Sequence, residues 1–553
     1  MDNQVSILNK STELEQYMDR WTYDEQRDCW CLEDILYTEK AAVPLFQRLS
    51  IFVPRAYLNE DGTINEGGRV GSYTAGTVPV VFENNAAGYS EMPHAWLGGP
   101  RCYADQYLKR GLIYVTVGCR GRESRDADGK LVGKAPITLV DLKTALRFLR
   151  HNRNVLPGDW DKVISVGWSA GGAMSSLLAV SGDHEWFRPY LQENGAFMDE
   201  SDSVFAAQIY CPIVDLEHAD QAYEWMFHAD KENENTPAGA AEVMTPFKQA
   251  LSKKLHDQYV AYFNTQKITD PDTGEKLLLN GDGRSGSAYD YLMMCLNRSA
   301  TDFLTRLSKG ELPQSYTVQD YLDGTYTFEK PAPPPVMPGK KNPFEGLPSL
   351  GHLLLRPSGE APVPAFKPNL MTCNGTAKHD WLTWDGEKAV IADLDSYILK
   401  HRRRMKPCPS FDKLDMSSGE NQVFGNSEND YVHFNSGLAA ALDELAEQFP
   451  KECEEVREAF SACRSDEALA EKVALINPLS YIGSGENSRQ ASHYRIRVGA
   501  CDADTSLSVS MLLALKLQNA GCGNVDFAMV WDQPHSEADY PGEVVDWIDS
   551  ICL

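Results

Sequence analysis

The sequence predicts an α/β fold in which a mostly parallel central sheet is flanked by helices and interrupted by one large insertion. The first observation is that short apolar stretches alternate with amphipathic stretches over residues 1–215 and again over residues 480–553. The second is a change to a charged, helix-forming composition between them, over residues 216–479. Such alternation is typical of parallel strands joined by right-handed crossover helices.

Four stretches of the N-terminal part are short, apolar and bounded by turn residues, as buried strands of a parallel sheet are. We predict strands at Arg48–Pro54, Val78–Phe82, Leu112–Val117 and Val163–Val166. Between the last two, apolar residues recur at helical spacing from Ile137 to Asn152, which predicts an amphipathic crossover helix.

The C-terminal part repeats this pattern. We predict strands at His493–Gly499 and Val525–Trp531, a helix at Leu507–Asn519 between them, and a closing helix at Val544–Leu553. Residues 1–215 and 480–553 are therefore expected to form one domain.

Residues 216–479 are expected to form a cap or lid domain inserted into the first. They contain the run Pro331–Pro338, which should be extended because proline lacks an N–H and restricts the residue before it. A second, independent domain would have the same composition, so this alternative stays open.

The charge and cysteine content narrow the class of protein. The 553 residues include 79 Asp and Glu against 52 Lys and Arg, a net charge of −27, which disfavours binding to nucleic acid or to a membrane surface. The 13 Cys are an odd number without a C-x-x-C pair, which favours a reducing compartment. Because neither a signal peptide nor a long apolar run is visible, we expect a soluble cytoplasmic protein, although a processed precursor would look the same.

The motif Gly167–Gly171 (Gly-Trp-Ser-Ala-Gly) follows a predicted strand directly and precedes a helix-like run, Ala173–Ala179. A strand, a sharp turn and a helix form the nucleophile elbow of the α/β-hydrolase fold, in which the serine side chain, here Ser169, projects from the sheet. The N–H of Ala170, at the start of the helix, could then donate to an oxyanion. A glycine-rich turn with a passive serine is the alternative.

A serine nucleophile needs a general base and an orienting acid, which follow it in the order acid, then histidine, in this fold. His535 alone of the 12 His follows the last predicted strand. Asp502 and Asp504 both follow the preceding predicted strand, His493–Gly499. Their chemistry barely favours one over the other as the acid. The second aspartate could face the substrate or cap the next helix. The loop 84–89 follows an early strand, and Gly88 is the candidate for the second oxyanion donor.

With the elbow, the Asp502–Thr505 stretch and the terminal His535, the chain resembles bacterial tannases (tannin acyl hydrolases) and their feruloyl-esterase-like relatives. Further stretches that match that family are Cys119–Arg122, Leu156–Asp159, Tyr210–Ile213 and Leu216–Asp220. The chain departs from the pattern at Trp168, where the family has a small residue, and at Ala87, where a glycine is expected.

The resemblance implies that Ser169 is the nucleophile, Asp502 the acid and His535 the base. It also implies that Lys406, Glu420 and Asp504 contact the galloyl hydroxyls. Two carboxylates and one ammonium suit a rigid row of phenolic hydroxyls. Without the resemblance, we would interpret Lys406 as part of a basic surface patch, because it closely follows the basic residues 401–404. We would interpret Glu420 as a turn residue.

Together these observations predict a serine esterase that hydrolyses gallate-type aromatic esters through an acyl-enzyme, with no metal or cofactor. The expected partner is a small aromatic ester; the oligomeric state is not predicted. A feruloyl, hydroxycinnamoyl or short-acyl carboxylesterase with the same triad is the first alternative. A serine peptidase of the same fold is less favoured, and a non-catalytic binding protein would not need the complete triad.

Overall fold

The computed structural model describes residues 13–553 except 85, 100–101, 234–241, 313–315, 326–377, 427, 484–486 and 523. The proline run Pro331–Pro338 lies outside the described residues. Among the described residues, no helix combines the length and the apolar character that crossing a bilayer requires.

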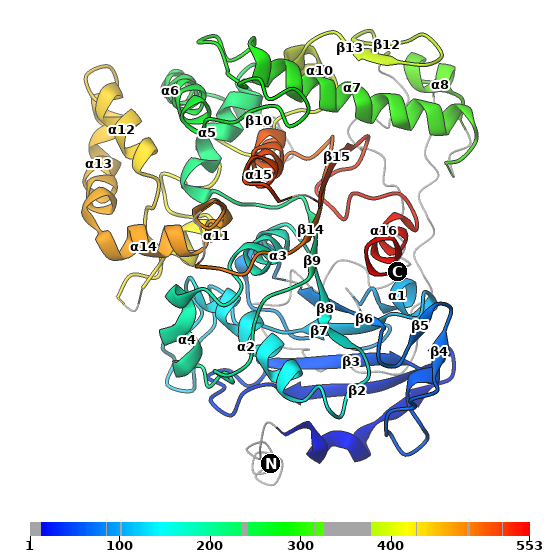
Figure 1. Cartoon of the computed structure of the whole chain (residues 1–553). Coiled ribbons are helices and arrows are strands. Elements are labelled where there is room, and N and C mark those ends of the chain that lie inside the picture. Colours follow the sequence, from blue (N-terminus) through cyan, green and yellow to red (C-terminus); the bar gives the residue numbers. More distant parts are fainter. Residues whose placement is uncertain are drawn as a thin grey trace.

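The centre of the described part of the chain is a nine-stranded sheet in the order β1-β2-β3-β7-β6-β8-β9-β14-β15 (Figure 1). Its strands are β1 (Thr22–Asp24), β2 (Cys29–Leu36), β3 (Arg48–Pro54), β6 (Pro79–Asn84), β7 (Ile113–Val117), β8 (Asp159–Trp168), β9 (Ala206–Tyr210), β14 (His493–Gly499) and β15 (Asn524–Val530). All pairs from β7 to β15 are parallel, whereas β3 pairs antiparallel with β2 and β7. The predicted α/β class with a mostly parallel sheet is therefore confirmed.

Helices and short strands of the same two chain segments surround this sheet. They are η1 (Leu14–Arg20), η2 (Arg55–Tyr57), η3 (Ala87–Tyr89), α1 (Ala104–Lys109), α2 (Ile137–His151), α3 (Ala170–Val180), η4 (Glu185–Phe187), α4 (Arg188–Glu193), α15 (Leu507–Asn519), α16 (Glu543–Cys552) and the pair β4 (Arg69–Val70) and β5 (Tyr73–Thr74). Helix α3 packs against β8 and β9, and α15 packs against β14 and β15.

Strand β14 pairs directly with β9, so residues 216–479 add no described strand to the main sheet. Their elements are α5 (Leu216–Phe227), α6 (Pro246–Thr265), α7 (Ser287–Ser308), α8 (Val318–Asp323), α10 (Leu394–Lys400), α11 (Gly419–Val423), α12 (Ser436–Leu445), α13 (Pro450–Ser465), α14 (Glu467–Leu475), η5 (Pro478–Ser480), and the pairs β10 (Glu232–Asn233) with β11 (Glu242–Val243) and β12 (Leu382–Trp384) with β13 (Ala389–Ile391). In Figure 1 these helices lie opposite the antiparallel strands β2 and β3. One hydrophobic core continues from the sheet into them, and a smaller core joins α6, α12 and α13.

Candidate active site

Ser169 occupies the turn between β8 and α3. Its backbone has φ 60° and ψ −127°, a region that side-chain-bearing residues rarely adopt. The turn is held on both sides: the Ser169 N–H donates to the Tyr210 carbonyl at 3.1 Å, and its carbonyl accepts from the N–H groups of Ala173 at 3.0 Å and Ile213 at 3.3 Å. These bonds fix the strained conformation that a nucleophile elbow would require.

The glycines beside Ser169 permit a close approach of three backbone segments. A Cβ at Gly167 would lie 2.3 Å from the Gly171 carbonyl oxygen, and a Cβ at Gly171 would lie 2.9 Å from Asn84 Oδ1. Real Cβ atoms do not come so close to a carbonyl oxygen, so the first position excludes a side chain. The Gly-x-Ser-x-Gly spacing thus has a steric cause here, and part of it comes from the end of β6.

Three predicted residues form one hydrogen-bonded series. His535 Nε2 lies 2.8 Å from Ser169 Oγ, and His535 Nδ1 lies 2.8 Å from Asp502 Oδ2. The other Asp502 oxygen accepts the N–H groups of Asp504 at 2.8 Å and Thr505 at 3.3 Å. Asp502 is fully buried, so of the two candidate aspartates it is the one whose carboxylate contacts the histidine.

The surroundings of His535 favour its charged form. Burial lowers the pKa of His535, but the Asp502 carboxylate, with contributions from Cys211 and Asp504, outweighs burial and holds that pKa well above its ordinary value. A histidine that accepts a proton readily, while hydrogen-bonded to a serine hydroxyl, has the chemistry of a general base.

The end of β9 joins the nucleophile turn to the histidine loop, and the sequence analysis did not identify it. The Tyr210 carbonyl accepts from Ser169, and its hydroxyl donates to Asp539 at 2.9 Å. The Cys211 thiol donates to the carbonyl of Ser536, the residue after His535. Ala206–Tyr210 was not predicted as a strand, because its small and polar residues give no local strand pattern.

The two predicted oxyanion donors lie on neighbouring elements. Ala170 is the first residue of α3, and η3, which contains Gly88 at φ 60°, packs against α3. A Cβ added to Gly88 would meet no heavy atom within 4 Å, so this backbone borders open space. Residue 85 of the same loop lies outside the described residues.

One hydroxyl group joins the segment that carries Lys406 to the loop that carries Asp502 and Asp504. Tyr223 Oη accepts the Lys406 N–H at 3.0 Å and donates to the Ala503 carbonyl at 3.0 Å. Ala503 separates Asp502 from Asp504. The Lys406 ammonium lies 4.1 Å from the centre of the Phe411 ring, within the range of a cation–π contact.

Glu420 lies in the first turn of α11, and α11 packs against η3, the turn of Gly88. Burial, and after it the Glu420 carboxylate, raise the pKa of Tyr89. Lys406 and Glu420 are therefore attached to different parts of the candidate site, Lys406 to the loop that carries Asp502 and Asp504 and Glu420 to the turn that carries Gly88.

The alternative interpretation of Lys406 as part of a basic surface patch is not supported by its neighbours. Arg404 is fully buried and forms an ion pair with the buried Glu224. Arg403 is paired with Asp230 at 2.7 Å. These arginines anchor the chain to the end of α5 immediately before Lys406.

Two buried carboxylates hold the segment between Lys406 and Glu420. Asp220 accepts the backbone N–H groups of three successive residues, Ser410, Phe411 and Asp412, at 2.7, 2.7 and 3.0 Å. Asp412 accepts those of Phe434 and Asn435 and contacts His433 at 2.6 Å. Burial raises the pKa of Asp220 to about 6. From the sequence, Asp220 stands out only as part of the stretch Leu216–Asp220 that matches the family, and this role was not predicted.

Two groups of described residues combine nitrogen, sulfur and oxygen donors that could hold a metal ion. They are Cys211, Asp502 and His535, and His401, Cys501 and Asp532. In the first group the histidine and aspartate are hydrogen-bonded to each other as described above. The second is fully buried and lies beside the same two loops.

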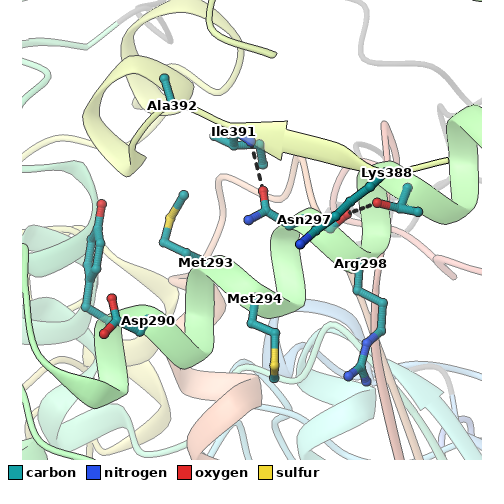
Figure 2. Close-up of a pocket in the computed structure, with 10 residues that line it drawn as sticks. Asp290, Met293, Met294, Asn297, Arg298, Lys388, Ile391 and Ala392 are labelled. Atoms are coloured by element: carbon teal, nitrogen blue, oxygen red, sulfur yellow. Dashed lines mark hydrogen bonds between the residues drawn. The ribbon is translucent and has the colours of Figure 1, made fainter. Parts of the chain in front are cut away.

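A cavity of about 540 Å³ lies between α7 and β13 (Figure 2). Asn297 on α7 crosses it to accept the Ile391 N–H at 2.8 Å. The lining residues are Tyr289, Asp290, Met293, Met294, Asn297, Arg298, Thr301, Lys388, Ile391 and Ala392. They include none of the predicted site residues, so this cavity is separate from the candidate active site.

Comparison with known proteins gives three kinds of match. The family model described as BD-FAE matches residues 104–254. Gut esterase 1 of Caenorhabditis briggsae is 33% identical over 105 residues, which are 19% of this chain and 18% of that protein. The chain spans less than a fifth of the length of that relative.

Matches to solved structures extend over nearly the whole chain. The tannin acyl hydrolase from Lactobacillus plantarum is 32% identical, with a TM-score of 0.73 over 95% of this chain and 94% of that one. A tannin acyl hydrolase in complex with ethyl gallate is 32% identical, with a TM-score of 0.72 over 95% and 94%. The Fusobacterium nucleatum tannase is 30% identical, with a TM-score of 0.71 over 95% of both chains.

Proposed function

The chain belongs to the tannin acyl hydrolase (tannase) family and is a carboxylic ester hydrolase, and from that premise we propose that it cleaves gallate-type aromatic esters with Ser169 as the nucleophile. The observation that carries the proposal is the series from Ser169 Oγ through His535 to Asp502, with 2.8 Å at each contact. This geometry is the one that serine acyl transfer requires.

In the proposed reaction, His535 Nε2 takes the Ser169 proton while Oγ attacks the ester carbonyl carbon. Asp502 accepts a hydrogen bond from the Nδ1–H of His535 and stabilises the imidazolium that forms. The imidazolium returns its proton to the alcohol oxygen, the alcohol leaves, and the galloyl group remains bound to Ser169. A water molecule then gives a proton to His535 while its oxygen attacks the acyl carbon. The imidazolium returns that proton to Ser169 Oγ, the bond between Oγ and the acyl carbon breaks, and the acid leaves.

The N–H of Ala170 and an N–H of the Gly88 turn are proposed to stabilise the oxyanion of both tetrahedral intermediates. Each such donor contributes about 10²–10³ to kcat in serine hydrolases. The placement of η3 against the start of α3 supports this assignment.

Lys406, Glu420 and Asp504 are proposed to select the acyl group. A galloyl ring presents three hydroxyls in one plane, which two carboxylates and one ammonium can bind from fixed positions. Family members were solved with ethyl gallate and with 3,4-dihydroxybenzoate, and both ligands carry neighbouring ring hydroxyls. Residues 216–479, which hold Lys406 and Glu420, are proposed to act as the cap over the catalytic domain formed by residues 1–215 and 480–553.

The test compares methyl gallate, methyl ferulate and p-nitrophenyl acetate as substrates of the wild type, Ser169→Ala and Lys406→Ala. Lys400→Ala is the matched control, because Lys400 is half exposed and pairs with Asp380. We expect Ser169→Ala to lose all three activities and Lys406→Ala to lose the gallate preference alone. Turnover by Ser169→Ala near the wild-type rate would reject the mechanism. A preference for ferulate or acetate that Lys406→Ala leaves unchanged would reject the acyl specificity and favour the hydroxycinnamoyl or short-acyl alternative.

A further inference from the structure

One buried histidine of the inserted segment contacts both loops that carry the proposed acid and base. His401, directly after α10, lies with Nε2 2.8 Å from Asp532 Oδ1 and 3.3 Å from the Cys501 sulfur. Cys501 immediately precedes Asp502, and Asp532 lies three positions before His535. A single imidazole ring therefore bridges the ends of β14 and β15.

The three side chains are removed from water. His401, Cys501 and Asp532 are each no more than 2% exposed. A carboxylate in such surroundings is costly to leave without a partner, and a charge-assisted hydrogen bond in a low dielectric holds its geometry closely. The His401–Asp532 contact is therefore a rigid link rather than a surface ion pair.

Aromatic packing fixes the imidazole ring in turn. The ring of Trp531 stacks on His401 with 5.4 Å between centroids and 14° between planes, and Trp381 packs on it at 5.0 Å. Tyr397 of α10 donates from its hydroxyl to the Ala500 carbonyl. Helix α10 is thus attached to both loops, by Tyr397 and by His401.

A backbone hydrogen bond also joins the two loops directly. The Cys501 N–H donates to the Gln533 carbonyl at 2.9 Å, and Asp532 has φ 56°, a conformation uncommon for residues other than glycine. The His535–Asp502 contact spans the same two loops. The His401 contacts and the His535–Asp502 hydrogen bond therefore span the same pair of loops.

We propose that His401 is a positioning residue for the triad, which sets the separation of the acid and base loops through Asp532 and Cys501 and so couples the inserted segment to the chemical step. This inference rests on the proposed function, because it assumes that Asp502 and His535 act together. It assigns a catalytic consequence to a residue that touches no reacting atom. A misplacement of about 1 Å in such a constellation costs on the order of 10² in rate.

The test uses His401→Gln, which keeps a donor, His401→Ala, which removes it, and Asp532→Asn, which removes the charge. His256→Gln is the matched control, because His256 is a buried histidine of α6 that contacts Asp257 at 3.0 Å, away from both loops. For each variant we would measure kcat and KM with p-nitrophenyl acetate and methyl gallate, the rate of inactivation by phenylmethylsulfonyl fluoride, the melting temperature and the bound metal.

We expect His401→Ala to lower kcat for both esters and the inactivation rate by one common factor of about 10–100, with KM changed less than about threefold. His401→Gln should recover part of this loss, and His256→Gln should show none of it at a similar melting temperature. Wild-type kcat in His401→Ala and Asp532→Asn, or an equal loss in His256→Gln, would overturn the inference. One equivalent of metal that His401→Gln releases would also overturn it, because the cluster would then be a metal centre. If Ser169→Ala is inactive while the His401 variants are unchanged, this inference alone fails; if Ser169→Ala is active, the proposed function fails.

Discussion

The loops at the carboxyl edge of the sheet and the segment between Lys406 and Glu420 organise their polar side chains by different means. At the sheet edge, the three predicted triad residues follow the ends of β8, β14 and β15 within a few positions. Parallel strand pairing brings those ends together. The segment between Lys406 and Glu420 contains no strand of the main sheet, and Asp220 holds it through backbone hydrogen bonds across 190 positions of sequence.

This difference separates two properties of the enzyme. The proposed chemical step depends on residues at the ends of the sheet strands, whereas the selection of the acyl group is proposed to depend on buried carboxylates far away in sequence. Variants at the sheet edge should therefore affect every ester alike, and variants that release the segment between Lys406 and Glu420 should affect aromatic esters alone.

The largest effect is expected from Ser169→Ala. Removal of Oγ should lower kcat for every ester by about 10⁴–10⁶, with an unchanged melting temperature because the backbone bonds of the turn remain. Ser181→Ala is the control, since Ser181 ends α3 and donates only within that helix. Steady-state rates with an aromatic and an acetate ester test this, and a loss confined to one of them would break the comparison.

Asp502→Asn should follow, with a fall in kcat of about 10⁴. The Asp502 charge is the largest of the causes that raise the pKa of His535 against burial, so the variant should lower that pKa. Only the neutral imidazole accepts the serine proton. The wild-type kcat/KM should therefore rise with pH through a pKa above the ordinary histidine value, and this rising limb should move to lower pH in the variant. A limb that stays in place would contradict the assignment of Asp502 as the orienting acid.

The sequence predicted the strands and helices around the site closely, because their patterns are local. Arg48–Pro54, His493–Gly499 and Leu507–Asn519 have the predicted bounds. Strand β9 was missed because Ala206 and Ala207 are small and Gln208 is polar, although Gln208 is buried and accepts from Arg495 at 2.7 Å. Its partner is distant in sequence, so no local pattern signals it.

The same division holds for the candidate site. The positions of Ser169 and His535 followed from strand ends and chain order, whereas Asp502 and Asp504 could not be ranked because the choice depends on the fold of a short loop. Lys406 and Glu420 came from the family resemblance alone. Tyr223, Asp220 and His401 were not anticipated, since each acts on a residue at least 100 positions away.

Asp412→Asn is expected to act on selection. One Asp412 oxygen accepts the N–H groups of Phe434 and Asn435, and the other contacts His433 and accepts from the Asn421 side-chain NH2 at 2.7 Å. An amide NH2 in place of that second oxygen cannot accept from Asn421. The KM for methyl gallate should rise about tenfold, equivalent to about 1.4 kcal/mol, while kcat/KM for p-nitrophenyl acetate changes less than about threefold. Asp443→Asn is the control, an aspartate of α12 that pairs with Arg457 and Arg464 at the surface. Equal losses for both esters would show that the segment also supports the triad.

The smallest effect is expected from Gly88→Ala. Gly88 has φ 60°, and a Cβ there would meet nothing within 4 Å, so only backbone strain is added, about 1–2 kcal/mol of unfolding free energy. Gly129→Ala is a matched control, because Gly129 has φ 81° and equally open surroundings in a turn of the exposed 126–130 loop. Both variants should unfold at similar denaturant concentrations. Only Gly88→Ala should lower kcat, by less than the 10²–10³ of a lost oxyanion donor, because the N–H is displaced and not removed. Equal kcat in the two variants would exclude the Gly88 turn from the oxyanion site and leave Ala170 as its proposed donor.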